Sequence, residues 1–285
     1  MKAPLPADGS RFTGDWLSLR EAMDHRSRAH GLAGFAAHYL AARCGPRRAR
    51  VIDLGAGSGS NLRYLKPRLG GRIDWHLLDQ DRDLLNAAVR DAPKGAEDDD
   101  HHIAAEVFDL RGPLAPRLAG ADLVTASALL DLVSADWVSR FIDACATARA
   151  AVLIAVSIDG RLEFTDVDPS DALVRRALAR DQARDKGLGP ALGAAAPGVL
   201  IDALTRRGYA ITVQPSDWHI DATDAELARA LITGWRDAAI SQCPAEAGRI
   251  RGWAEQRIDG IVTGASALRV GHVDILGLPG REPLG

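Results

Sequence analysis

Three closely spaced glycines form the clearest candidate ligand site in the sequence. Gly55, Gly57 and Gly59 lie in the segment VIDLGAGSGSN, between a β-branched apolar run and a stretch with helical character. Glycines at such a turn let the backbone pass close to a ligand and present N–H groups at the start of a helix. A dinucleotide fingerprint would require glycine at position 60, where the chain has Ser60, and Asp53 precedes the turn. Both features count against a nicotinamide or flavin site.

The segment DLGAGSGSN resembles motif I of class I S-adenosylmethionine-dependent methyltransferases. In this family an acidic residue two positions before the first glycine helps to hold the methionyl moiety, and Asp53 occupies that position. The family, like other Rossmann-type folds, places an acid on the ribose hydroxyls after the next strand, where WHLLDQD supplies Asp79. The resemblance also implies cofactor contacts from Gly55, Ala56, Gly57, Asn61 and Gln80.

Two later segments extend the resemblance in the same order along the chain. EVFDL places Asp109 and Leu110 where the family contacts the adenine, and ADLVTASALLDL resembles the segment that lines the methionyl chain, implicating Ala126 and Ser127. The resemblance spans roughly residues 30 to 280 apart from insertions, and it implies S-adenosyl-L-methionine as cofactor. Taken alone, Asp53 or Asp109 could also be a helix cap or a turn former.

The residues around the methyl acceptor are less clearly marked. Methyl transfer from a sulfonium is an in-line displacement, and it needs a base only when the acceptor must lose a proton. After the fourth strand the chain reads SALLD, so the NPPY-type signature of several amino-group methyltransferases is absent. Asp131 and His219 are candidate bases, and Trp218 is a candidate aromatic wall. A turn cap for Asp131 and simple packing of His219 beside Trp218 are the alternatives.

Basic residues suggest how an acceptor could be held. Arg20 and Arg28 share one side of an expected N-terminal helix and would suit an anionic acceptor such as a carboxylate, and Lys186 lies in a glycine-rich loop that could line the acceptor pocket. A solvated charged helix face is the alternative for each of them. The segment DDDHH, which ends at His102, does not predict a metal site, because consecutive ligands in a loop rarely converge on one ion.

Short apolar strands alternate with helical stretches around these residues, which predicts a Rossmann-like, mainly parallel α/β sheet of seven strands. By the family resemblance the sheet ends in an antiparallel hairpin, for which residues 211–214 and 272–278 are the candidates. The remaining strands are expected at residues 50–54, 73–78, 103–108, 123–127 and 151–158, with helices at 32–42, 60–69, 82–89, 136–148 and 199–207.

The domain prediction places an N-terminal helical segment, residues 1–30, over the site and a methyltransferase domain at residues 31–285. Helical cap insertions are expected at about residues 165–195 and 221–264. Asp168 as N-cap with Pro169 in the first helical position should begin the first insertion helix, which should run to about Lys186. A capping box from Thr223 to Glu226 should begin a helix of the second insertion.

Composition narrows the range of partners. The 285 residues carry a formal net charge of −3, which provides no general positive field and disfavours a nucleic-acid partner. Three separated cysteines and the lack of a long apolar run predict a cytoplasmic protein without membrane insertion, and the oligomeric state is not indicated. The predicted function is methylation of a small-molecule acceptor in a capped pocket. The alternatives are an RNA or protein methyltransferase and a non-catalytic adenosylmethionine-binding sensor or partner subunit.

Overall fold

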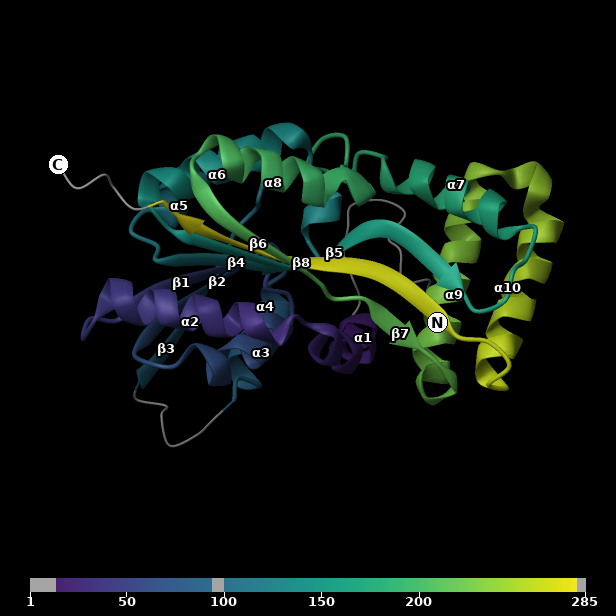
Figure 1. Ribbon diagram of the computed structural model, residues 1–285, viewed down its shortest axis with the longest axis horizontal. Helices are drawn as coiled ribbons and strands as arrows, with labels where there is room; N and C mark the ends of the chain where they lie inside the picture. The colour runs from purple at the N-terminus through teal and green to yellow at the C-terminus, as the bar shows by residue number, and fades with distance from the viewer. Residues whose placement is uncertain (1–13, 94–99, 281–285) are drawn as a thin grey trace.

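An eight-stranded, mainly parallel sheet forms the centre of the computed structural model, which describes residues 14–93 and 100–280 (Figure 1). The main path of the sheet runs β3-β2-β1-β4-β5-β8-β6, and β7 also pairs with β8. β8 runs antiparallel to β5, β6 and β7, and all other described strand pairs are parallel. The strands are β1 Ala49–Leu54, β2 Ile73–Asp79, β3 His101–Val107, β4 Leu123–Ser127, β5 Ala151–Phe164, β6 Tyr209–Pro215, β7 Trp218–Ile220 and β8 Leu268–Pro279.

This topology confirms the predicted Rossmann-like α/β class with a terminal antiparallel pair. The sheet has eight strands instead of seven, because Ser216 and Asp217 interrupt the last edge strand and divide it into β6 and β7. The first seven residues of β5, up to Ser157, are all buried, as expected for a central strand covered on both faces.

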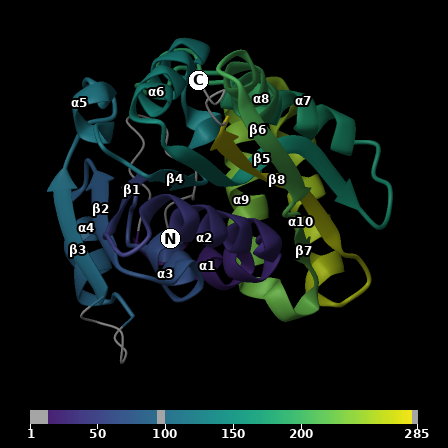
Figure 2. The ribbon, with the colours of Figure 1, turned by 60° about the vertical axis from the view of Figure 1, so that its left-hand side comes forward.

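Helices cover both faces of the sheet (Figures 1 and 2). One face is covered by α2 His30–Cys44, α3 Ser60–Leu69 and α4 Arg82–Arg90, and the other by α5 Leu114–Leu118, α6 Ala135–Ala148 and α8 Ala196–Arg206. Each layer buries its apolar side chains in a separate core against the strands. The order of β1 between β2 and β4 places the switch point of the sheet at the ends of β1 and β4, where open α/β sheets bind their ligands.

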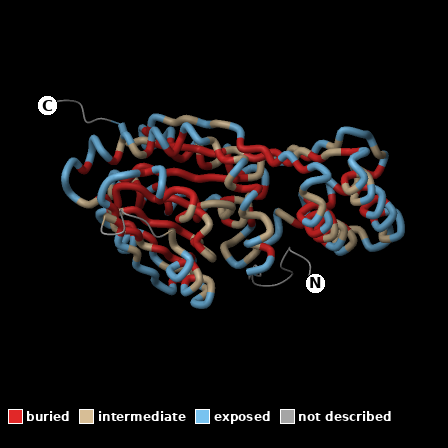
Figure 3. The backbone as a smooth tube through the Cα atoms, turned by 90° about the horizontal axis from the view of Figure 1, so that it is seen from below, coloured by how far each residue is buried: buried red, intermediate tan, exposed pale blue. Residues whose placement is uncertain are grey.

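A helical cap lies beyond one end of the sheet and has a core of its own, visible as a second group of buried segments in Figure 3. It consists of α7 Asp171–Gln182, α9 Ala225–Gln242 and α10 Ala247–Val262, which fall within the two segments expected to be inserted. The N-terminal helix α1 Gly14–Ser27 packs against this cap through Trp16 and Met23. No helix in the described ranges is long and apolar enough to cross a membrane.

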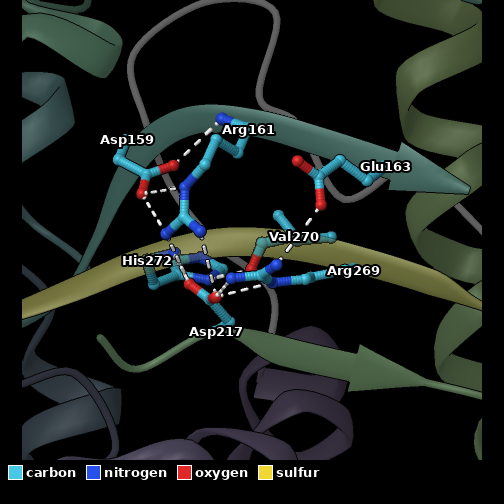
Figure 4. A network of polar contacts seen from close by, with 7 residues as sticks. All are labelled: Asp159, Arg161, Glu163, Asp217, Arg269, Val270 and His272. Atoms are coloured by element: carbon cyan, nitrogen blue, oxygen red, sulfur yellow. Dashed lines mark hydrogen bonds and ion pairs between the residues drawn. The ribbon is translucent and has the colours of Figure 1, made fainter.

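The distal halves of β5 and β8 form an antiparallel ribbon that reaches from the sheet to the cap (Figures 1 and 4). Asp217, which is almost fully buried, accepts hydrogen bonds from Arg161 of β5 at 2.8 Å, from Arg269 of β8 at 2.7 Å and from the backbone N–H of His272 at 3.0 Å. A second carboxylate, Asp159, also pairs with Arg161. The network therefore connects the two long strands to the segment that leads into β7.

The predicted starts of two cap helices were wrong. Asp168 is not the N-cap of α7, because the helix begins at Asp171 with Ser170 in the N-cap position. The Oδ1 of Asp168 accepts the N–H of Ser170 at 2.6 Å in a turn that precedes the helix. In the second insertion Asp221 accepts the N–H of Thr223 at 2.8 Å, so a short 3-10 helix precedes α9 and the predicted capping box does not form. In the second place Asp221 takes the N–H of Thr223, the donor that the capping box would have used.

Candidate functional site

A cavity of about 320 Å³ opens at the carboxyl ends of β1 to β4. Its walls are formed by the glycine turn after β1, the ends of β2, β3 and β4, helix α1 and the loop at residues 186–188. The structure brings together most of the residues selected from the sequence. The predicted residues that line the cavity are Arg20, Gly55, Ala56, Gly57, Asn61, Asp79, Gln80, Asp109, Leu110, Ser127 and Lys186.

The glycine turn is fixed to the end of β2 by a backbone contact. Gly57 has a φ of +52°, a left-handed conformation that favours glycine, and its N–H donates to Oδ2 of Asp79 at 2.8 Å. The other oxygen of Asp79 accepts the N–H of Asp81 at 2.9 Å. Burial raises the pKa of Asp79, and the backbone N–H groups of Asp81 and Gly57 oppose this shift by stabilising the carboxylate.

The last glycine of the turn serves helix packing. A Cβ on Gly59 would lie 2.8 Å from Cβ of Ala88 in α4, and the φ of Gly59 is +84°. Only glycine therefore allows α3 to begin this close to α4, which sets the direction of the helix that starts at the cavity.

Asp53, which the family resemblance places near the methionyl moiety, does not itself line the cavity. Its side chain is fully buried, and its Oδ1 accepts a hydrogen bond at 2.8 Å from Nδ2 of Asn61, which does line the cavity. Burial raises the pKa of Asp53 to about 7, despite the hydrogen bond from Asn61. Its Oδ2 is buried without a hydrogen-bond partner among the described residues.

Arg28 is buried in the same polar chain and is not available to an acceptor in the cavity. Its Nη1 donates to Oδ1 of Asn61 at 2.9 Å, and its Nε donates to Oδ2 of Asp274 in β8 at 3.1 Å. The guanidinium also lies 4.3 Å from the ring centre of Tyr64. Arg28 thus connects the junction of α1 and α2 to the first turn of α3 and to β8.

The end of β3 supplies an aromatic wall that the sequence reasoning missed. The strand ends at Val107, one residue earlier than predicted, and Phe108, Asp109 and Leu110 then face the cavity. Asp109 forms an ion pair with Arg111, which holds the pKa of Asp109 below its usual range. The position of Phe108 directly before Asp109 in EVFDL could have suggested its role.

At the end of β4, Ser127 lines the cavity, whereas Ala126 is buried and does not. Ala128, also in the cavity wall, has a φ of +52°, a costly conformation for a residue other than glycine. Its N–H donates to the carbonyl of Ala155 in β5 at 3.0 Å, which helps to hold this conformation. Backbone strain of this kind is common at ligand sites, and no sequence signal marks it.

Helix α1 places a charged pair at the other side of the cavity. Arg20 donates to Asp24 through Nε at 2.8 Å and through Nη2 at 3.1 Å, and both residues line the cavity. Trp218 is buried behind them and donates from its indole N–H to Asp24 at 3.1 Å. Trp218 was predicted to form an aromatic wall of the pocket. In the structure it is buried behind the wall and supports it.

His219 was wrongly selected as a cavity residue. It follows Trp218 in β7, and side chains alternate between the two faces of a strand, so the buried Trp218 leaves His219 exposed to solvent. In the register of β7 and β8 it lies opposite Arg269, and it does not line the cavity.

Asp131 lies in a short 3-10 helix, Leu130–Leu132, and the nearby Leu129 and Leu132 line the cavity. It is not itself a lining residue, although its side chain remains partly accessible. Burial raises the pKa of Asp131, and the charges of Arg20 and Lys186 oppose this shift. Lys186, which does line the cavity, lies 3.7 Å from Oδ2 of Asp181 in α7.

No family model and no curated protein matches the sequence. Solved structures with a similar fold include a cyclopropane-fatty-acyl-phospholipid synthase-like protein from Lactobacillus casei, with 14% identity, coverage of 91% of this chain and 99% of that one, and a TM-score of 0.49. A second is a SAM-dependent methyltransferase from Geobacter sulfurreducens in complex with S-adenosyl-L-homocysteine. Its sequence identity is 15% and its TM-score is 0.44, and the match covers 94% of this chain and 99% of that one. Likeness at this level concerns the fold, and no residue role is taken from it.

Within residues 14–93 and 100–280, no three His, Cys, Asp or Glu side chains are grouped so that they could hold an ion. The first two aspartates of the DDDHH segment, Asp98 and Asp99, lie outside the described residues. The cavity is lined by backbone N–H groups, carboxylates, the cationic side chains of Arg20 and Lys186, and apolar side chains.

Proposed function

We propose that this chain binds S-adenosyl-L-methionine in the cavity and transfers its methyl group to a small-molecule acceptor. The observation that carries the proposal is the contact between the N–H of Gly57 and the carboxylate of Asp79 at the wall of the cavity. This contact joins the glycine turn to the acid after β2, the two features by which the sequence resembles class I methyltransferases.

The residues present fit the two ends of this cofactor. Asp79 can accept hydrogen bonds from ribose hydroxyls, while Leu84, Phe108 and Leu110 offer an apolar wall to a flat base. Asn61 and Ser127 offer polar groups to the methionyl end, and the unpartnered Oδ2 of Asp53 lies behind Asn61. A cavity of about 320 Å³ lies within the range of about 300–1,000 Å³ typical of small-molecule sites.

When bound, the cofactor would supply a methyl group on a positively charged sulfur, and the residues of the chain would hold the acceptor in line with it. Positioning and exclusion of water can provide much of the rate enhancement of such a displacement. Helix α1 and the loop at residues 186–188 contribute to the cavity wall from separate parts of the chain. We infer that α1, the described part of the predicted N-terminal segment, covers the site, and that Asp131 takes a proton where the acceptor must lose one. Residues 1–13 of that segment lie outside the described residues.

Calorimetric titration with S-adenosylmethionine and S-adenosylhomocysteine tests the binding site. Asp79→Ala should weaken both affinities about tenfold or more, because it removes a charged hydrogen-bond acceptor and the support of Gly57. Gly57→Val should weaken them as well, because φ is +52° and the new side chain would meet Leu17. Asp91→Ala, at an exposed ion pair with Arg90, is the matched control and should change neither affinity. Unchanged binding in folded Asp79→Ala and Gly57→Val proteins would refute the site.

Transfer is tested separately from binding. Incubation with labelled S-adenosylmethionine and a small-molecule metabolite extract should give a labelled product that is lost in Asp79→Ala. Tight binding without any labelled product would favour a sensor or partner subunit, and label on RNA or protein alone would favour a macromolecular acceptor.

A further inference from the structure

Arg20 of α1 has a hydrogen-bond donor in the wall of the cavity that no described residue accepts. The Nε and Nη2 groups of Arg20 donate to Asp24, but its Nη1 group has no hydrogen-bond partner in the described part of the chain. A guanidinium carries five N–H donors and no acceptor, so one edge of Arg20 remains available in the wall of the cavity.

The guanidinium of Arg20 is held rigidly. One edge is fixed by Asp24, which is itself held by the indole N–H of Trp218. Its Cζ lies 5.1 Å from the ring centre of Trp218 and 6.0 Å from that of Trp16, so aromatic rings restrict the group further. A guanidinium that is already immobilised loses little entropy when it binds an anion, which increases its affinity for one.

The carboxylates near this edge are already occupied. Asp24 accepts three hydrogen bonds, two from Arg20 and one from Trp218. Asp181 accepts from Arg184 at 3.1 Å and from Gln242 at 3.3 Å, and it also faces the ammonium of Lys186 at 3.7 Å. A cationic ligand would therefore find few unused acceptors here.

Asp131 is the remaining carboxyl group close to Arg20 and Lys186. Burial raises its pKa, although the charges of Arg20 and Lys186 oppose this shift, so Asp131 accepts a proton more readily than an ordinary aspartate and is a weaker partner for the two cations. The side chain of Lys186 is only 11% exposed, so its positive charge acts where solvent screening is limited.

The rest of this end of the cavity is apolar. Leu17 of α1, Leu129 and Leu132 after β4, and Leu188 of the loop all line it. Apolar side chains of this kind bury a hydrocarbon body, while the few polar groups among them fix its orientation.

We propose that the methyl acceptor is a small organic anion, with an apolar body against these leucines and one anionic head group bound by the free edge of Arg20 opposite Lys186. This deepens the proposed function and rests on it for the methyl donor. The anionic head group can be a carboxylate or a phosphate, since a guanidinium edge binds both in a bidentate manner.

A matched series of aromatic probes tests the proposal by calorimetry, with and without saturating S-adenosylhomocysteine. Benzoate and phenyl phosphate carry the two head groups, benzamide is the neutral counterpart of benzoate, and benzylamine is the cation. At least one anion should bind at least tenfold more tightly than benzamide and benzylamine, and the tighter anion identifies the head group. Equal binding of benzoate, phenyl phosphate and benzamide, tighter binding of benzylamine, or no anion binding at millimolar concentration overturns the proposal.

Three variants locate the binding group. Arg20→Gln and Lys186→Gln, on different segments of the chain, should each weaken binding of the preferred anion about tenfold, while S-adenosylhomocysteine still binds. Arg26→Gln, also on α1 but paired with Asp224 on the exposed surface, is the control and should leave anion binding unchanged. Anion binding that survives in both Arg20→Gln and Lys186→Gln overturns the assignment. Anion binding that depends on Arg20 without any binding of S-adenosylhomocysteine would instead refute the methyl-donor assignment alone.

Discussion

Asp53 and His272 are both buried, and burial shifts their pKa values in opposite directions. The pKa of Asp53 rises to about 7, and that of His272 falls to about 4, because desolvation penalises the charged form of each group. His272 is further held as a buried ring 3.0 Å from the carbonyl of Val270, with its face against Trp218. Two neutral titratable groups therefore lie behind the walls of the cavity at mildly acidic pH.

The Asp53→Asn variant should become more stable relative to the native protein as pH rises from about 4 to 7. Unfolded Asp53 releases its proton near pH 4, but the folded protein retains the proton up to about pH 7, so the native carboxyl lowers stability across this window. Asparagine does not titrate and keeps an acceptor for Asn61. Urea unfolding of both proteins from pH 4.5 to 8 should show a difference that grows to pH 7 and is constant above it.

His272 makes the comparison between the two proteins necessary. Its lowered pKa costs stability as pH falls from about 6.5 to 4, which is the opposite slope over nearly the same window. The free energy of unfolding of the native protein alone can therefore change little with pH across this window. The difference between the Asp53→Asn and native proteins does not contain the contribution of His272. A difference between the Asp53→Asn and native proteins that is independent of pH would contradict the raised pKa of Asp53.

At the level of helices and strands, the glycine turn fixes the distance between α3 and α4. Gly59→Ala places a Cβ 2.8 Å from Cβ of Ala88, in a backbone with φ of +84°. The positive φ should lower the free energy of unfolding by about 1–2 kcal/mol, and the displacement of α4 by the new Cβ should lower it by about 1–3 kcal/mol more. Gly208→Ala is the control for the first cost, because its φ is +73° but nothing lies within 4 Å of the new Cβ. Unfolding free energies that are equal in the two variants would show that α4 moves away without cost.

The sequence predicted which strand ends meet and most of the side chains that face the cavity, but not all of them. Each of the first four strands was found within two residues of its bounds, because apolar runs and glycine or aspartate endings mark strands clearly, and so Asp79, Asp109 and Ser127 were found. His219 and Trp218 were misjudged because the face of a strand depends on its register, which three residues do not specify.

Contacts between distant segments were beyond sequence reasoning for a different reason. Arg28 was predicted to suit an anionic acceptor, with a solvated helix face as the alternative, yet it is buried and its partner Asp274 is 246 residues away. The left-handed backbone of Ala128 has no compositional signature either, since it follows from the pairing of β4 with β5. Such features arise from tertiary packing, which overrides local propensity.

At the level of the whole molecule, α1 connects the cap to the glycine turn. Arg26 pairs with Asp224 of the cap at 2.5 Å, while Glu21 pairs with Arg63 of α3 at 2.6 Å. Leu17 lies beside Gly57, at 3.5 Å from the position that a Cβ would take there. The cavity therefore has walls that belong to both the sheet and the cap, and its shape depends on how firmly the two are joined.

The β5–β8 ribbon provides one joint between sheet and cap, and Asp217 is the carboxylate at its centre (Figure 4). Asp217→Ala removes the common acceptor of Arg161, Arg269 and the N–H of His272. Because both guanidinium groups are more than a third exposed and can be rehydrated, the expected loss is about 1–3 kcal/mol, less than for a fully buried pair.

Hydrogen–deuterium exchange should locate this loss in the cap. Amides of α9 and α10 should exchange faster in Asp217→Ala, while those of β1 and β4 keep their protection, because the ribbon leads only to the cap. Glu163→Gln is the control, since Glu163 is half-exposed and pairs with Arg269 at 3.4 Å, and it should change stability by less than about 0.5 kcal/mol. Equal loss of protection in the sheet and the cap would mean that the two unfold as one unit, and that the ribbon does not act as a separate joint.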